Sequence, residues 1–188
     1  MVPDLDARAL LAIYGGAHGA WAVPMVAATL LGEGWTSAAL LPLLAWSRTR
    51  RFAGLLTAGI VTQAILVKAL KEAFGRVRPW IALGLPAPIM SPHDPSFPSG
   101  HAAGCFCVAA FLALALPVAW PGARGWARAV VVLAGLLAVL IALSRVYLGA
   151  HFPSDVAVGA LLGTLVGALA GAVYTRGRTG VERAAKKG

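Results

Sequence analysis

Residues 129–147 read AVVVLAGLLAVLIALSRVY, and this stretch decides the class of fold because it holds a single charge, Arg145, in nineteen residues. At a helical rise of about 1.5 Å per residue, such a run is long enough for the roughly 30 Å hydrocarbon core of a bilayer. The sequence therefore predicts a transmembrane helix here.

Further apolar runs lie on both sides of this one, at 9–31, 35–47, 52–70, 102–120 and 156–174. Together the runs predict an all-α polytopic membrane protein, a six-transmembrane-helix bundle in which residues 1–188 form a single membrane-embedded domain. The run 9–31 contains Gly15, Gly16 and Pro24, which a covered membrane helix tolerates. The run 35–47 is too short to cross alone unless its flanking residues turn within the interface.

The composition agrees with this class, because 59% of the residues are hydrophobic, 12% are charged and the mean hydropathy is +0.79. A soluble domain holds about 25% charged residues. A net charge of +9 would suggest nucleic acid for a soluble protein, but cytoplasmic loops of membrane proteins collect Lys and Arg. We therefore expect the bilayer, and no nucleic acid, as the partner; the sequence specifies no oligomeric state.

The distribution of the cations predicts an orientation. If the N-terminus is cytoplasmic and six spans follow, Arg8 and ten other cations, 11 of the 16 in total, lie on the cytoplasmic side. The five on the other side are Lys68, Lys71, Arg76, Arg78 and Arg145. We expect a multi-pass protein of the cell (inner) membrane with cytoplasmic termini and a site that faces the periplasmic or extracellular side.

Two of three polar clusters flank the stretch between the third and fourth runs. Lys71 and Arg78 are seven residues apart, a spacing that would put both on one helix face, although taken alone they also fit cations that extend into the headgroups. Pro98-Ser99-Gly100-His101 precedes the fourth run directly, where Gly100 and the first helical N–H groups suit an anion. An ordinary N-cap explains Ser99, but it does not explain why His101 enters an apolar helix.

The third cluster joins Ser144-Arg145 to His151 and Asp155. A carboxylate four residues after His151 can fix its tautomer and leave the other ring nitrogen free to attack, although His and Asp at this spacing are also common as surface pairs. Cations, a helix N-terminus, two histidines and a carboxylate supply each part of a phosphoryl transfer. A metal site would need several convergent carboxylates, so neither a metal nor another cofactor is implied.

The three clusters resemble the three-part signature of the type 2 phosphatidic acid phosphatase family. The matching segments are Lys71-Glu-Ala-Phe-Gly-Arg-Val-Arg78-Pro79, Pro98-Ser99-Gly100-His101 and Ser144-Arg145-Val-Tyr-Leu-Gly-Ala-His151-Phe-Pro-Ser-Asp155. By position, the resemblance implies that His151 attacks phosphorus and forms a phosphohistidine, that Asp155 orients it, and that His101 protonates the leaving oxygen and later activates water. The groups implied to hold the phosphate are Lys71, Arg78, Ser99, the Gly100 N–H and Arg145.

The expected function is therefore metal-independent dephosphorylation of a membrane lipid phosphate or pyrophosphate, such as undecaprenyl pyrophosphate, phosphatidylglycerophosphate or phosphatidate. The alternatives are a lipid-linked phosphotransferase that uses the same histidine, a non-enzymatic anion-binding membrane protein, and a vanadium haloperoxidase, which the apolar content disfavours. Outside the signature, we interpret Arg76 and Lys68 as headgroup cations, and His93 and Asp94 as part of a solvated, proline-rich loop.

Overall fold

The computed structural model describes residues 4–16, 19–32, 47, 49–88 and 93–185, and within this part the chain is helical and holds no strand. Its elements are α1 (Leu5–Ile13), α2 (Ala22–Leu31), α4 (Arg50–Phe74), α5 (Pro79–Ala82), α6 (Gly100–Ala119), a 3₁₀ turn (Pro121–Ala123), α7 (Arg124–Tyr147) and α8 (Pro153–Ala185). The prediction of an all-α protein is confirmed.

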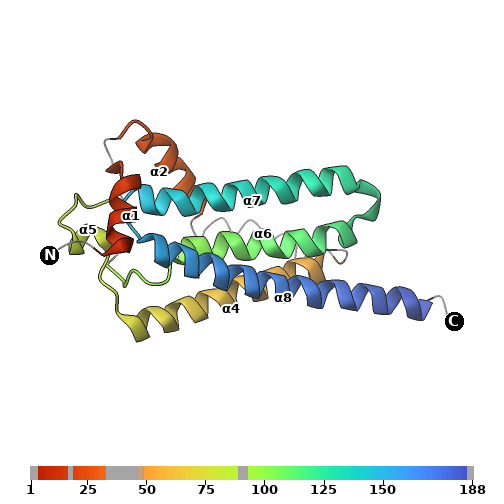
Figure 1. Cartoon of the computed structure of the whole chain (residues 1–188). Helices are drawn as coiled ribbons and strands as arrows, with labels where there is room; N and C mark the ends of the chain where they lie inside the picture. Colours follow the sequence, from red (N-terminus) through yellow and green to blue (C-terminus); the bar gives the residue numbers. More distant parts are fainter. Residues whose placement is uncertain (1–3, 17–18, 33–46, 48, 89–92, 186–188) are drawn as a thin grey trace.

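Four long helices, α4, α6, α7 and α8, form the body of the bundle (Figure 1). Each lies in a stretch that is long and apolar enough to cross a membrane. On α8, Leu161, Leu165 and Leu169 follow one another at helical spacing and are each at least 60% exposed, so an apolar stripe faces outward. These four helices correspond to the four predicted runs from residue 52 onward; α8 continues well past the predicted end at 174, to Ala185, and the other ends differ by five residues or fewer.

The first predicted run, 9–31, is divided into two short helices, α1 and α2. The ring of Tyr147 lies where a side chain on Gly15 or Gly19 would be, and the Gly15 N–H donates to the Tyr147 carbonyl at 3.1 Å. Pro24 lies in the first turn of α2, where it removes no helical hydrogen bond. Most of the second predicted run, 35–47, lies outside the described residues.

Helix α1 lies across the end of the bundle where α7 ends and α8 begins, and the C-terminus lies at the opposite end (Figure 1). Asp6 of α1 accepts a hydrogen bond of 3.0 Å from the N–H of Ser154 in the first turn of α8. Nine residues are too few to cross a bilayer, so α1 stays at this end. Arg8, in α1, and the end of α8 therefore lie at opposite ends of the bundle. The expectation that both lie on the cytoplasmic side of the membrane is wrong.

The same end of the bundle brings together four helix ends that are far apart in sequence. α4 and α7 end there, and α6 and α8 begin there (Figure 1). These are the helix ends that carry the three polar clusters of the sequence. The fold therefore brings the three polar clusters together at one end of the bundle.

The close contact between α6 and α8 depends on glycines spaced by four residues along α8. A Cβ atom on Gly159 would lie 2.4 Å from the carbonyl oxygen of the residue that caps α6, and one on Gly163 or Gly167 would lie 2.0 or 2.1 Å from a carbonyl oxygen within α6. Small residues of this kind let membrane helices approach until their backbones touch. The pair α6–α8 is thereby fixed in register next to the polar region.

We expect Gly163→Ala to destabilise the protein by about 1–3 kcal/mol, because the new methyl group must push the α6 backbone away. This corresponds to a fall in melting temperature of at least about 2 °C in detergent. Gly135→Ala is the matched control, since a Cβ on Gly135 of α7 meets no atom within 4 Å. Equal melting temperatures for the two variants would contradict the close packing of α6 on α8.

Candidate active site

Arg78 is a buried cation at the centre of the polar region, with a side chain only 4% exposed. Gly75 ends α4 with a φ of +57°, and Pro79 begins α5, so Arg78 lies in an extended connection between the two helices. Its Nη1 donates to the carbonyl of Ala150 at 2.9 Å and lies 3.2 Å from Nε2 of His151. A buried guanidinium therefore faces one ring nitrogen of His151.

Asp94 connects Arg78 to Lys71. Lys71 donates from Nζ to Oδ2 of Asp94 at 2.6 Å and to the carbonyl of Pro95. Arg78 donates to Oδ1 of Asp94 at 2.8 Å and to its carbonyl at 2.7 Å. The prediction that Lys71 and Arg78 share one face of a helix is wrong, because α4 ends at Phe74. The two cations lie close together because both bind Asp94.

His151 lies in the loop between α7 and α8 and is 2% exposed. Gly149 turns the chain with a φ of +71°, and the N–H groups of Ala150 and His151 both donate to the carbonyl of Arg145, at 3.0 and 3.1 Å. Nδ1 of His151 lies 3.7 Å from Oδ2 of Asp155, which is longer than a hydrogen bond. Among the described residues this nitrogen has no hydrogen-bond partner.

Asp155 is fully buried in the first turn of α8. Its Oδ2 accepts hydrogen bonds from the N–H of Phe152, at 2.9 Å, and from the hydroxyl of Ser96. Its Oδ1 accepts from Nη1 of Arg76 at 2.6 Å, and its backbone carbonyl accepts from the N–H of Ser99 at 2.9 Å. Asp155 therefore links the start of α8 to the end of α4 and the start of α6.

Arg145 is fixed by a residue of α2. Its Nη1 donates to the hydroxyl of Thr29 at 2.7 Å, and that hydroxyl lies 3.0 Å from Oγ of Ser144, which donates to the carbonyl of Ile141 at 2.7 Å. Arg145 is 3% exposed. Its charge acts on His151 from the α7 side, as that of Arg78 does from the α5 side.

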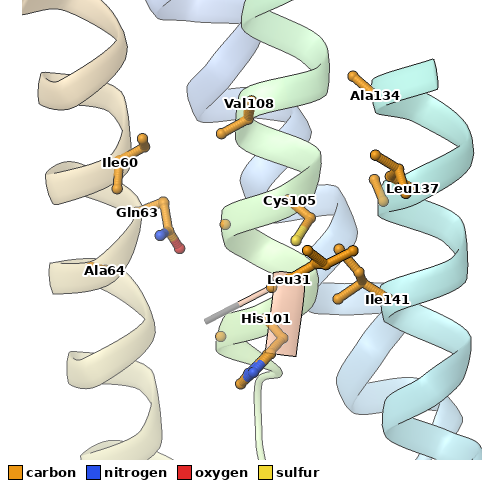
Figure 2. Close-up of a pocket in the computed structure, with 14 residues that line it drawn as sticks. Leu31, Ile60, Gln63, Ala64, His101, Cys105, Val108, Ala134, Leu137 and Ile141 are labelled. Atoms are coloured by element: carbon orange, nitrogen blue, oxygen red, sulfur yellow. The ribbon is translucent and has the colours of Figure 1, made fainter. Parts of the chain in front are cut away.

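The start of α6 contributes Ser99, Gly100 and His101. Ser99 is the N-cap and accepts a hydrogen bond of 3.4 Å from Ala102 N. His101 lines a largely apolar cavity of about 420 Å³ between α4, α6 and α7 (Figure 2). Gly100 borders this cavity and also a second one of about 470 Å³, which Lys71 lines.

Some of the predicted site residues therefore contact one another directly, and others are connected through a third residue or through the backbone. Arg78 contacts His151 directly, Lys71 reaches Arg78 through Asp94, and Ser99 is joined to Asp155 through the backbone. Gly100 and His101 lie on the walls of the neighbouring cavities. Among the described residues, no three His, Cys, Asp or Glu side chains are grouped as a metal ion requires.

Two groups outside the spans have shifted pKa values that reflect these contacts. Burial, together with the positive charges of Arg78 and Arg145, lowers the pKa of His151 to about 3. Partial burial opposes ionisation of Asp94, but the hydrogen bond from Lys71 and the charge of Arg78 outweigh it and lower the pKa of Asp94 to about 2. His151 is therefore neutral, and its ring can act as a nucleophile, at physiological pH.

The comparison with known proteins identifies the family. Residues 52–178 match the PAP2 superfamily, so the chain belongs to it. A crystal structure described as the first transmembrane PAP2 type phosphatidylglycerolphosphate phosphatase, from Bacillus subtilis, aligns with a TM-score of 0.71 and 31% identity over 88% of this chain and 80% of that one. Together with the four apolar helices, this makes the chain a membrane protein.

Two curated relatives are named phosphatases. Phosphatidylglycerophosphatase B of Bacillus subtilis (strain 168) is 41% identical over 98 residues, which are 52% of this chain and 46% of the relative. An undecaprenyl-diphosphatase of Sulfolobus acidocaldarius is 34% identical over 122 residues, which are 64% of this chain and 54% of the relative. The chain thus matches about half the length of these relatives.

Several residues outside the predicted site contact it in the structure. We interpreted Asp94 as part of a solvated loop and Arg76 as a headgroup cation, but they contact Arg78 and Asp155 respectively. Thr29 was not singled out at all. One signal was present: the chain has only seven acidic residues, and an acidic residue in so apolar a chain usually has a partner.

We expect Asp94→Asn to bind orthovanadate about tenfold more tightly than wild type, which corresponds to about 1.4 kcal/mol. The reason is that an anion must compete with the Asp94 carboxylate for Lys71 and Arg78. Glu72→Gln is the matched control, because it removes the same charge from a side chain that pairs only with the exposed Lys68 among the described residues. Equal dissociation constants of orthovanadate for wild type and Asp94→Asn would show that the carboxylate does not compete.

We also expect the buried His151 to make the protein acid-sensitive. Because its pKa falls from about 6.5 to about 3 on folding, the unfolded chain binds more protons between these values, and stability falls as the pH is lowered through this window. The loss of melting temperature between pH 7.5 and 4.5 should therefore be smaller for His151→Gln than for wild type. His93→Gln, at an exposed position, should behave like wild type. An identical loss in all three proteins would contradict burial of a neutral His151.

Proposed function

We propose that this protein removes phosphate from a membrane lipid phosphate or pyrophosphate, without a metal ion, through a phosphohistidine at His151. The observation that carries the proposal is the 3.2 Å contact between Nη1 of Arg78 and Nε2 of His151, both buried. A guanidinium donates and cannot accept, so the contact favours the tautomer with a lone pair on Nε2 and the proton on Nδ1. That nitrogen faces Arg78, one of the cations that would hold a phosphate group.

The proposed reaction has two steps. Nε2 of His151 forms a bond to phosphorus while the bond from phosphorus to the lipid oxygen breaks, and His101 donates a proton to that oxygen. The oxygen of a water molecule then forms a bond to phosphorus while the bond from phosphorus to Nε2 breaks, His101 accepts a proton from that water, and inorganic phosphate leaves. Asp155 orients the His151 ring, and its charge stabilises the ring while the ring carries positive charge.

The phosphate oxygens carry the negative charge that develops during both steps, so the site needs fixed donors around them. The proposed donors are Lys71, Arg78, Ser99, the Gly100 N–H and Arg145. Lys71 and Arg78 already converge on one carboxylate, that of Asp94, within hydrogen-bond distance. A phosphate group can replace that carboxylate with the same pattern of charge-assisted hydrogen bonds.

A lipid substrate fits the place of the site, at the end of four apolar helices and beside a largely apolar cavity. The names of the relatives favour phosphatidylglycerophosphate and undecaprenyl pyrophosphate, and phosphatidate carries the same phosphate monoester. We further propose that the chain forms one membrane-embedded domain in the cell membrane and that α4, α6, α7 and α8 cross the bilayer. The predicted six spans are not part of this proposal, because α1 is too short to cross and lies at the end of the bundle opposite to the end of α8. The basic C-terminal segment would be cytoplasmic and the site, together with α1, would face the periplasmic or extracellular side.

We expect the purified protein in detergent to release phosphate from at least one of these lipids with EDTA present. His151→Ala should reduce turnover by at least about 1,000-fold, because the covalent route is lost. It should also abolish an acid-labile phosphoprotein that forms in wild type. His93→Ala is the control and should retain full activity. Wild-type turnover by His151→Ala would exclude this histidine as the nucleophile, and inactivity of wild type on all the lipids would favour a non-enzymatic anion-binding protein.

A further inference from the structure

The cation closest to the buried Asp155 carboxylate is Arg76, which lies outside the signature positions. Its Nη1 donates to Oδ1 of Asp155 at 2.6 Å, whereas Nδ1 of His151 lies 3.7 Å from Oδ2. Asp155 is fully buried, so an unpaired charge there would be strongly unfavourable. The ion pair with Arg76 therefore stabilises the carboxylate in its ionised form.

Arg76 is itself held on several sides. Its guanidinium lies 4.1 Å from the centre of the Phe152 ring, and its Nη1 also donates to the hydroxyl of Ser154 at 2.7 Å. Its backbone carbonyl accepts from the N–H of Ser96 at 2.7 Å, and the Ser96 hydroxyl donates to Oδ2 of Asp155. Arg76 and Ser96 thus bind the two oxygens of one carboxylate and are joined to each other.

Asp6 of α1 completes the arrangement. Its Oδ2 accepts from Nη2 of Arg76 at 2.7 Å, and its Oδ1 accepts from the N–H of Ser154 at 3.0 Å. The planar guanidinium thus binds Asp155 with one nitrogen and Asp6 with another, a geometry that a lysine ammonium does not reproduce. A cation that merely extends into lipid headgroups would not make two short ion pairs inside the protein.

We infer that Arg76, held by Asp6, is a positioning residue that fixes the Asp155 carboxylate and through it the ring of His151. This inference rests on the proposed phosphatase function. Arg76 contacts Asp155 through Oδ1, whereas Nδ1 of His151 lies 3.7 Å from the other oxygen, Oδ2. Its effect should therefore fall on the chemical step, while Lys71 and Arg78 continue to bind phosphate.

The test is a double-mutant cycle between Arg76→Ala and Asp155→Ala, measured with the lipid that wild type hydrolyses fastest. Arg76→Ala alone should lower kcat about 10- to 100-fold, the factor that corresponds to one charge-assisted hydrogen bond, with KM changed by no more than about twofold. In the Asp155→Ala background, Arg76→Ala should change kcat by no more than about twofold, because the group it positions is gone.

Three further variants complete the design. Arg76→Lys should recover part of the kcat that Arg76→Ala loses. Asp6→Asn should also lower kcat, because it weakens the contact that holds the guanidinium of Arg76. Arg8→Ala, which removes an exposed cation from α1, should leave kcat unchanged. Melting temperatures identify any variant that fails to fold, and Arg76→Lys and Asp6→Asn then replace Arg76→Ala in the cycle.

Two results would overturn the inference. The first is an equal loss of kcat from Arg76→Ala with and without Asp155, and the second is a rise in KM at unchanged kcat, which would place Arg76 among the substrate-binding groups. Both leave the proposed function intact if wild type hydrolyses the lipid and His151→Ala does not. Failure of the proposed function would appear separately, as inactivity of the wild-type protein.

Discussion

The arrangement of the polar region depends on a constraint set by the apolar bundle: a charge buried at a helix end must have partners. Arg78 meets this constraint through the carboxylate and carbonyl of Asp94, the carbonyl of Ala150 and the ring of His151. These partners belong to two other segments, so one guanidinium joins its own turn after α4 to the loop before α6 and to the loop after α7. Each of those segments carries a part of the proposed chemistry.

Helix packing and chemistry are coupled at the contact between α6 and α8. Gly159 lets the α8 backbone approach the carbonyl of Ser99, and in the same region the Ser99 N–H donates to the carbonyl of Asp155. The start of α6, which is proposed to offer N–H groups to an anion, is therefore held against the start of α8, which carries Asp155. A shift of one helix along the other would separate the groups proposed to bind phosphate from those proposed to orient His151.

Hydropathy predicted the four long helices well, because an apolar run of about 20 residues in a bilayer satisfies its backbone hydrogen bonds best as a helix. It failed at 9–31, since Tyr147, more than a hundred residues away, packs where the glycines lie and separates α1 from α2. The signature residues could be found from local spacing. Asp94, Arg76 and Thr29 could not, because their partners are set by long-range folding, and the two helical turns inferred between Lys71 and Arg78 were ended by Gly75.

In the proposed site, the buried cations and His151 surround one phosphate-sized anion. An experimental structure of the protein with bound orthovanadate tests this arrangement most directly. We predict the vanadium next to Nε2 of His151, with oxygens bound by Lys71 and Arg78 and with the Asp94 carboxylate displaced from both. Vanadate bound elsewhere, with Asp94 still joining Lys71 to Arg78, would contradict the account.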